Sequence, residues 1–310
     1  MHDLILTGPL LGSATKALEN EFKVLRMWEA GDLDIFLHDC KTVRFLASAG
    51  NIQIDRAMID QLPALEIISN YGVGIDTIDL DAARARKIGV TNTPDVLNDA
   101  VAEHALALML AACRRVVDAD AFVRAGKWLD GPYPFTGELT GAKIGILGLG
   151  RIGKEIARRC QAFKMQVVYH GRHEQKFEPF PYYADLEHMA REVDWLIAVV
   201  PGDTGTEGLV SRKVLQALGP KGVLVNLGRG SLVDEKALLD LLKTGALGGA
   251  ALDVFADEPR VSPEFRSLHN VVLSPHQGSA TIKTRWAMGD LFVRNLLAHR
   301  DGNPLISPVI

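Results

Sequence analysis

Three ionisable residues in the second half of the chain could together catalyse proton transfer. Arg229, Glu258 and His276 each follow an apolar run, in the segments NLGRG, ALDVFADEP and VVLSPH. An imidazole can donate or accept a proton near neutral pH, and a carboxylate beside it favours its protonated form. A guanidinium can bind a carboxylate through two hydrogen bonds. These residue types predict a site that binds an acid and transfers a proton to it.

Each of the three residues also has a simpler interpretation when it is taken alone. Arg229 could pair with a surface carboxylate, Glu258 before Pro259 could belong to a solvated turn, and His276 could be a hydrogen-bonded structural residue. The carboxyl ends of parallel strands meet at one edge of a sheet, where such sheets bind their ligands. If the three apolar runs are parallel strands, the three side chains lie on that edge and fit a 2-oxo acid.

A glycine turn in the middle of the chain predicts a dinucleotide site. Residues 144–147 are apolar and resemble a buried strand, and apolar residues recur at helical spacing after the turn. Gly148, Gly150 and Gly153 have the spacing that allows a tight turn, a close phosphate and a closely packed helix. Arg151 and Ile152 lie in the same turn. The alternative interpretation is an ordinary glycine-rich turn between a strand and a helix.

The end of the next strand indicates which dinucleotide is bound. An acidic residue about twenty positions after the turn usually holds the ribose hydroxyl of NAD. The chain instead has Gly171 and Arg172 after His170. A guanidinium can bind a 2′-phosphate, so this loop favours NADPH over NADH. In the alternative interpretation Arg172 is a solvated loop residue and Glu174 binds the ribose.

Composition restricts the class of protein. The length of 310 residues suits about two domains. The formal net charge of −4 argues against a nucleic-acid partner. Cys40, Cys113 and Cys160 lack metal-ligand spacing, so we expect reduced cysteines, no metal and a cytoplasmic location. No apolar run reaches the ~18 residues of a membrane span, and the N-terminus does not resemble a signal peptide.

Strand and helix patterns alternate twice along the chain. The first part has strand patterns at residues 4–6, 43–47, 65–69 and 90–92 and helical patterns at 13–21, 55–61 and 80–87. A long helical pattern covers about residues 100–126. The second part has strand patterns at 144–147, 165–169, 195–200, 222–227, 249–255 and 271–274, and a last helical pattern covers about 281–299. The alternation predicts two α/β lobes with parallel sheets.

Several segments resemble the D-isomer-specific 2-hydroxyacid dehydrogenase family, and they follow one another in the family's order. They are NYGVGID (70–76), GLGRIG (148–153), NLGRGSLVDE (226–235), GGAALDVFADEP (248–259) and SPHQGSAT (274–281). The resemblance implies two Rossmann- or flavodoxin-like lobes with a cleft between them. It also implies a discontinuous substrate-binding domain, residues 1–98 plus 284–310, and a dinucleotide-binding domain, residues 99–283.

The resemblance also implies roles for individual residues. Arg229, Glu258 and His276 match the family's catalytic trio. Val73 and Gly74 match a loop whose N–H groups bind the substrate carboxylate, and Asp253 matches a residue that contacts the nicotinamide. These roles are expectations.

The resemblance narrows the expected activity as well. Gly171–Arg172 and the block NTPDVLND resemble NADPH-dependent glyoxylate/hydroxypyruvate reductases. Gln277 and Trp286 are less typical of them and are expected near the pocket. One alternative activity is the reduction of larger 2-oxo acids such as hydroxyphenylpyruvate. Another is a dinucleotide-sensing corepressor without turnover, because this fold serves both kinds of protein.

A homodimer is the expected assembly. The stretch 101–115 is apolar over more of its circumference than one core contact needs. The family resemblance favours the same assembly. The alternative is that this helix is buried between the two lobes of one monomer.

Overall fold

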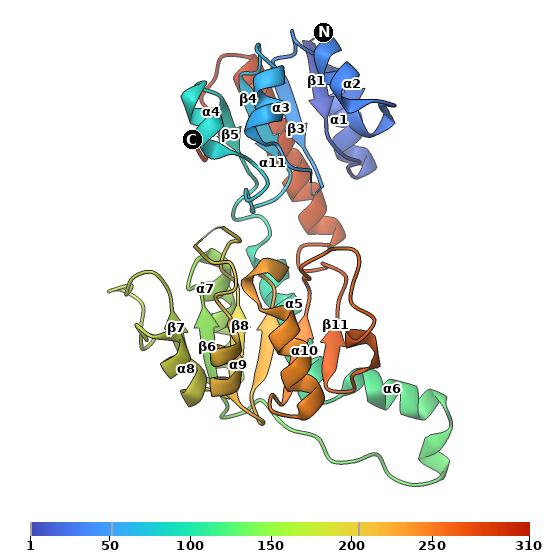
Figure 1. Ribbon diagram of the computed structural model, residues 1–310, viewed down its shortest axis with the longest axis vertical. Helices are drawn as coiled ribbons and strands as arrows, with labels where there is room; N and C mark the ends of the chain where they lie inside the picture. Colours follow the sequence, from blue (N-terminus) through green and yellow to red (C-terminus); the bar gives the residue numbers. More distant parts are fainter. Residues whose placement is uncertain (1, 51, 204) are drawn as a thin grey trace. The chain divides into compact units, whose positions relative to one another are not determined.

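The chain folds into two compact units in the computed structural model, which describes residues 2–50, 52–203 and 205–310. Unit 1 comprises Met1–Leu97 and Thr281–Ile310, and unit 2 comprises Asn98–Ala280 (Figure 1). Unit 1 therefore contains both ends of the chain.

Unit 1 contains a five-stranded sheet in the order β2-β1-β3-β4-β5, with every pair parallel. Its strands are β1 (His2–Leu6), β2 (Phe22–Arg26), β3 (Phe45–Ser48), β4 (Ile67–Asn70) and β5 (Gly89–Thr91). Its helices are α1 (Gly12–Glu21), α2 (Leu33–Asp39), α3 (Arg56–Gln61), α4 (Leu80–Ala85) and α11 (Ile282–Arg300). The last helix, α11, packs against α1 and β4.

Unit 2 contains a six-stranded parallel sheet in the order β11-β10-β9-β8-β6-β7. Its strands are β6 (Lys143–Leu147), β7 (Gln166–His170), β8 (Trp195–Ala198), β9 (Val223–Asn226), β10 (Gly249–Leu252) and β11 (Val271–Leu273). Its helices are α5 (Asn98–Cys113), α6 (Val116–Arg124), α7 (Arg151–Ala162), α8 (Leu186–Glu192), α9 (Arg212–Leu218) and α10 (Glu235–Thr244).

The strand order explains where each unit can bind a ligand. In both sheets the first strand lies inside the sheet, with the second on one side and the third on the other. The connections on the two sides of such a strand run in opposite directions, which opens a crevice at its carboxyl end. In unit 2 that strand is β6, and the glycine turn follows it directly. The predicted fold class, two parallel α/β domains, is confirmed.

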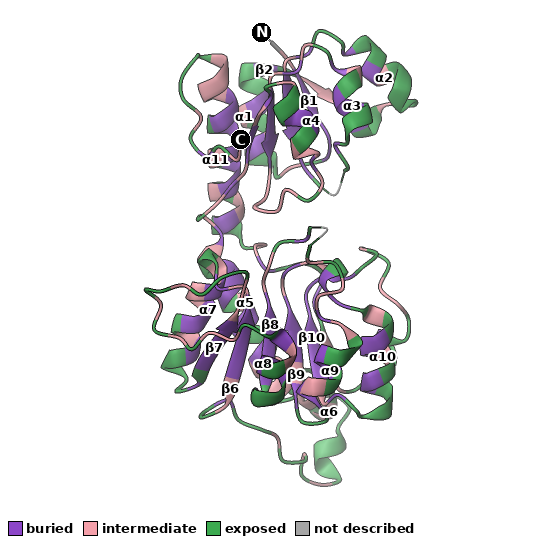
Figure 2. Cartoon of the chain, turned by 60° about the vertical axis from the view of Figure 1, so that its left-hand side comes forward, coloured by how far each residue is buried: buried purple, intermediate pink, exposed green. Residues whose placement is uncertain are grey.

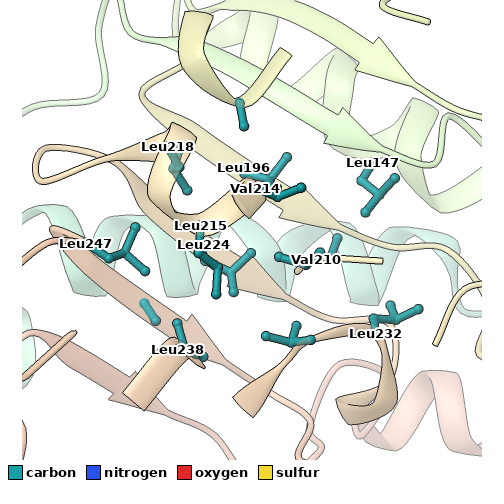
Figure 3. Packing of buried hydrophobic residues seen from close by; sticks show 14 of the residues in the cluster. Leu147, Leu196, Val210, Val214, Leu215, Leu218, Leu224, Leu232, Leu238 and Leu247 are labelled. Carbon is teal, nitrogen blue, oxygen red and sulfur yellow. The ribbon is translucent and has the colours of Figure 1, made fainter. Parts of the chain in front are cut away.

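Apolar side chains fix these sheets between their helices. Figure 3 shows leucines and valines of β8, β9, α9 and α10 pointing toward one another. Leu196, Leu215, Leu224 and Leu238 have no exposed surface. Figure 2 shows the same burial along the strands of both sheets. The rigid strands therefore provide fixed starting points for the loops that carry the polar residues.

Aspartate side chains begin five of the helices. Asp32, Asp55, Asp79, Asp185 and Asp234 each accept a hydrogen bond from the amide three residues later, at the start of α2, α3, α4, α8 and α10. Such caps satisfy an amide at the helix start that has no partner inside the helix. Helix α7, like α1, α6 and α9, begins without a side-chain cap, and its N-cap residue is Gly150.

The long helical pattern near residues 100–126 proved to be two helices. Arg115 adopts the left-handed conformation with φ 49°, which ends α5 and separates it from α6. The Arg115 guanidinium then binds the Asp118 carboxylate at 2.9 Å. The periodicity predicts one helix because both pieces have helical spacing, and the single left-handed residue between them leaves no mark on that pattern.

Strand β2 was not predicted. Its sequence FKVLR has one buried residue at its start, and it forms one edge of the sheet of unit 1. An edge strand buries less surface than a central strand, so its hydrophobic pattern is weak.

Among the residues that the structure describes, no helix combines the length and the apolar character needed to cross a membrane.

Candidate active site

His276 and Glu258 form a hydrogen-bonded pair at the carboxyl edge of the sheet of unit 2. The Nδ1 atom of His276 lies 2.8 Å from the Oε2 atom of Glu258. The Glu258 side chain is 19% exposed and the His276 side chain 44%. Because Nδ1 faces the carboxylate, Nε2 is the nitrogen left to meet a ligand. One ring nitrogen, Nδ1, is therefore held by the protein, and the other, Nε2, is accessible to a ligand. A proton donor needs this arrangement.

The backbone of His276 is held in an uncommon conformation. Its φ of 54° lies in the left-handed region, which costs a residue with a Cβ about 1 kcal/mol or more. The N–H of His276 donates to the carbonyl oxygen of Asp253 at 2.8 Å. The next two amides, of Gln277 and Gly278, donate to the Asp253 carboxylate at 2.7 and 2.8 Å. These bonds hold the loop in the conformation that directs His276 toward Glu258.

The carboxylate of Glu258 is held ionised by its surroundings. Burial alone would raise its pKa, but the hydrogen bonds from His276 and from the Phe255 amide outweigh that effect. The nearby positive charge of Arg229 acts in the same direction, so the pKa of Glu258 lies below its usual value of 4.5. Glu258 therefore carries a negative charge at neutral pH, next to the His276 ring.

Arg229 lies close enough to influence Glu258, and its loop is tightly constrained. The side chain of Asn226 accepts from the Gly228 amide at 3.1 Å and donates to the Arg229 carbonyl at 2.9 Å. A Cβ at Gly202 would lie 2.8 Å from Cγ of Arg229, so this glycine leaves room for the arginine. The three predicted catalytic residues therefore share one edge of one sheet.

The glycine turn has the shape of an anion-binding cradle. Gly148 has φ 101°, and a Cβ at Gly153 would lie 2.1 Å from the Gly148 oxygen, so both positions require glycine. A Cβ at Gly150 would meet no atom within 4 Å. Protein packing therefore does not explain Gly150, whereas an approaching phosphate would. The uncapped first turn of α7, with Arg151, Ile152 and Gly153, offers its amides to the same anion.

The loop after β7 presents Arg172 to solvent. Gly171 and Arg172 follow the last strand residue, His170, and the Gly171 carbonyl accepts from the Tyr182 hydroxyl at 3.1 Å. The Arg172 side chain is exposed and makes no hydrogen bond or ion pair with the described part of the chain. Glu174, the alternative ribose ligand, is also exposed. The residues of this loop and of the glycine turn fit a dinucleotide with an extra phosphate.

Val73 and Gly74 lie in unit 1, in the loop after β4. Their carbonyl oxygens accept from the side-chain amides of Asn92, at 2.9 Å, and Asn70, at 2.7 Å. Among the described residues, the N–H groups of Val73 and Gly74 have no hydrogen-bond partner. Two neighbouring unsatisfied amides suit a carboxylate ligand.

Sequence reasoning missed the polar residues that support the site. Asn226 forms hydrogen bonds within the Arg229 loop. Ser274 donates to the Asp253 carboxylate at 2.6 Å. His104 of α5 contacts both Ser274 and Asp253. The family resemblance predicts that Asp253 contacts the nicotinamide, and this stays a prediction. In the structure the Asp253 side chain is 2% exposed and its carboxylate accepts hydrogen bonds from the protein.

Comparison with known proteins gives one consistent result. Residues 106–278 match the family model for the NAD binding domain of D-isomer specific 2-hydroxyacid dehydrogenases. Glyoxylate/hydroxypyruvate reductase A of Arabidopsis thaliana is 42% identical over 99% of this chain and 98% of its own. Hydroxyphenylpyruvate reductase of Plectranthus scutellarioides is 41% identical with the same coverage.

A solved structure agrees with these sequence matches. It is the NADPH-dependent glyoxylate/hydroxypyruvate reductase of Sinorhizobium meliloti, in complex with NADP and malonate. It is 41% identical and superposes with a TM-score of 0.94 over 99% of this chain and 96% of its own. From the family model, the full-length relatives and this structure, the chain belongs to the D-isomer-specific 2-hydroxyacid dehydrogenase family.

Proposed function

We propose that this enzyme reduces small 2-oxo acids, glyoxylate and hydroxypyruvate, to D-2-hydroxy acids with NADPH. The hydrogen-bonded pair of Glu258 and His276, on the same sheet edge as the glycine turn, is the observation that carries this proposal. The two reductases of glyoxylate and hydroxypyruvate named above support it, and one of them was solved with NADP.

Each predicted residue has a distinct task in the proposed reaction. When bound, NADPH supplies the hydride that the substrate's carbonyl carbon accepts. The imidazolium of His276 gives the proton at Nε2 to the carbonyl oxygen, while Glu258 keeps the imidazolium oriented and stabilises its charge. Arg229 binds the substrate's carboxylate and carbonyl oxygens, and the amides of Val73 and Gly74 bind its carboxylate.

A spectrophotometric assay of NADPH oxidation tests the proposed function. The assay compares glyoxylate and hydroxypyruvate with hydroxyphenylpyruvate, because the Plectranthus relative is named for that larger acid. We expect the highest kcat/KM with one of the two small acids. Higher kcat/KM with hydroxyphenylpyruvate would replace the proposed substrate. NADPH binding without oxidation of the cofactor by any of the three acids would instead favour a sensor.

Glu258→Gln should change the pH dependence of the reaction. The pKa of Glu258 lies below 4.5, so its charge is present above that pH and is lost only as the pH falls through the lowered value. The neutral amide cannot stabilise the imidazolium, so the alkaline limb of kcat/KM should move to lower pH. Profiles of the wild type and the variant measure this shift. Coincident alkaline limbs would remove Glu258 from the mechanism.

Arg172→Asp should weaken the binding of NADPH. The new carboxylate repels a 2′-phosphate but can accept a hydrogen bond from a ribose hydroxyl. We expect KM for NADPH to rise strongly and KM for NADH to stay similar or fall. Glu174→Gln is the matched control, because it tests the other residue of this loop that could bind the ribose. An unaltered preference for NADPH in Arg172→Asp would mean that the phosphate is bound elsewhere.

We propose further that the enzyme is a homodimer. The buried residues of α5 pack on α7 and β10 within unit 2. In unit 2, the large apolar side chains that remain exposed to solvent begin at α6, which follows α5 in the chain. Helix α6 has no buried residue and extends away from the sheet of unit 2 (Figures 1 and 2). Three exposed valines lie on α6 itself, and further exposed apolar side chains follow it: Val116, Val117 and Val123, then Trp128, Leu129 and Phe135. A monomer rarely exposes so many large apolar side chains on one extension.

A cavity of about 620 Å³ supports the dimer proposal. It lies beside the edge strand β11, and its lining combines apolar residues such as Val117 and Val271 with charged ones such as Arg266. A second copy of the chain could cover both this cavity and the exposed extension through one symmetric contact.

Light scattering tests the dimer. We expect twice the 33.7 kDa chain mass at micromolar concentration. Leu129→Asp, which charges the 94% exposed side chain, should shift the mass toward the monomer. Leu11→Asp in unit 1 is the control at another exposed leucine. A wild-type mass of one chain would refute the dimer.

We also propose that the enzyme works in the cytoplasm. All three cysteines are free thiols, and burial raises the pKa of Cys160 to about 12. An unreactive buried thiol suits a reducing compartment.

A further inference from the structure

Asp253 holds almost every residue of the loop that carries His276. Its backbone carbonyl accepts from the His276 amide, and its carboxylate accepts from the Ser274 hydroxyl and the amides of Gln277 and Gly278. Pro275 is the exception, because proline has no N–H group. The conformation of the His276 loop therefore depends on one buried carboxylate and on whatever orients that carboxylate.

His104 is the side chain that reaches this carboxylate from outside the two loops. It lies on α5, and its Nε2 atom is 3.1 Å from Oδ1 of Asp253 and 2.9 Å from Oγ of Ser274. The His104 side chain is 22% exposed. It links α5 to Asp253 across 149 positions of sequence and to Ser274, in the loop of His276, across 170.

The hydrogen-bond pattern determines which nitrogen of His104 carries a proton. The ionised Asp253 carboxylate can only accept hydrogen bonds. Ser274 donates its single hydroxyl proton to Oδ1 of Asp253 at 2.6 Å, so its oxygen is also an acceptor toward His104. Nε2 of His104 must therefore carry a proton and donate it to these two oxygens.

We propose that His104 is a positioning residue for the reaction: its Nε2–H fixes the Asp253 carboxylate and Ser274, and thereby holds the loop that directs His276 toward Glu258. His104 acts through Asp253 and does not touch the reacting atoms. This inference rests on the proposed function in so far as it concerns turnover, but the effect on the loop does not depend on the substrate.

The geometry explains why the contact matters. His276 has a left-handed backbone, which the surrounding hydrogen bonds must maintain. Without the His104 donor, Oδ1 of Asp253 keeps Ser274 and the Gln277 amide but loses its link to α5. The carboxylate can then turn, and the loop amides turn with it. A displacement of the proton donor by a fraction of an ångström lowers the rate of the chemical step more than it lowers cofactor binding.

His104→Phe removes the donor and keeps a ring, and His104→Gln keeps an N–H donor at the position of Nε2. If circular dichroism shows that His104→Phe is unfolded, His104→Ala takes its place, because alanine favours a helix such as α5. His299→Phe is the matched control. His299 also directs Nε2 at a carboxylate, Glu66 at 3.0 Å, and is 26% exposed, but it belongs to α11 of unit 1.

Two measurements decide the matter. The first is steady-state kinetics, with the dissociation constant of NADPH measured separately by fluorescence. The second is hydrogen–deuterium exchange of the peptide that contains His276, Gln277 and Gly278. For His104→Phe we expect kcat to fall about tenfold to a hundredfold with unchanged NADPH affinity, and the peptide to exchange faster. His104→Gln should restore both values, and His299→Phe should change neither.

The outcomes separate this inference from the proposed function. If none of the 2-oxo acids supports oxidation of NADPH by the wild type, the proposed function fails. The exchange data alone then still test the role of His104. Normal kcat and normal exchange in His104→Phe would overturn the inference. A kcat lowered equally by the phenylalanine and glutamine variants would also overturn it, because the N–H donor would then be irrelevant.

Discussion

The pairing of His276 with Glu258 is the interaction on which the candidate site depends. The carboxylate fixes Nδ1 at 2.8 Å and leaves Nε2 to the ligand. Neither residue could hold this geometry alone, because both stand on loops and His276 has a left-handed backbone. The pair is maintained by backbone amides: Phe255 donates to Glu258, and the amides after His276 donate to Asp253.

The parallel sheet of unit 2 brings these loops together. Strands β9, β10 and β11 are neighbours, and Arg229, Glu258 and His276 follow them in that order. Parallel neighbours end at the same edge, so three residues distant in sequence share one surface. Tight packing between the loops then fixes their relation. A Cβ at Gly230 would lie 1.9 Å from the Phe255 carbonyl carbon, so the loop of Arg229 packs directly on the loop of Glu258.

Much of this arrangement could be predicted from the sequence. Residue type and position at strand ends identified Arg229, Glu258 and His276 as candidates, and glycine spacing identified the turn at Gly148. These signals are local, so a single sequence carries them. The family and the fold class predicted from the motifs are confirmed.

The rest could not be predicted, because it depends on contacts between distant residues. The bond from His104 to Asp253 spans 149 positions, and in sequence His104 resembles any other histidine in an apolar helix. The break at Arg115 depends on the conformation of one residue, which helical periodicity does not record. Asp253 could be matched to a ligand role from its motif, but its hydrogen bonds to the His276 loop became visible only in the folded structure.

Single-turnover kinetics of His276→Ala test the central claim most directly. Enzyme in excess over NADPH is mixed with the preferred 2-oxo acid, and the loss of NADPH absorbance gives the rate of the chemical step. Without the proton donor we predict that this rate falls by about a hundredfold to ten-thousandfold, while the dissociation constant of NADPH stays that of the wild type. A rate equal to that of the wild type, with the variant saturated with NADPH and substrate, would contradict the account.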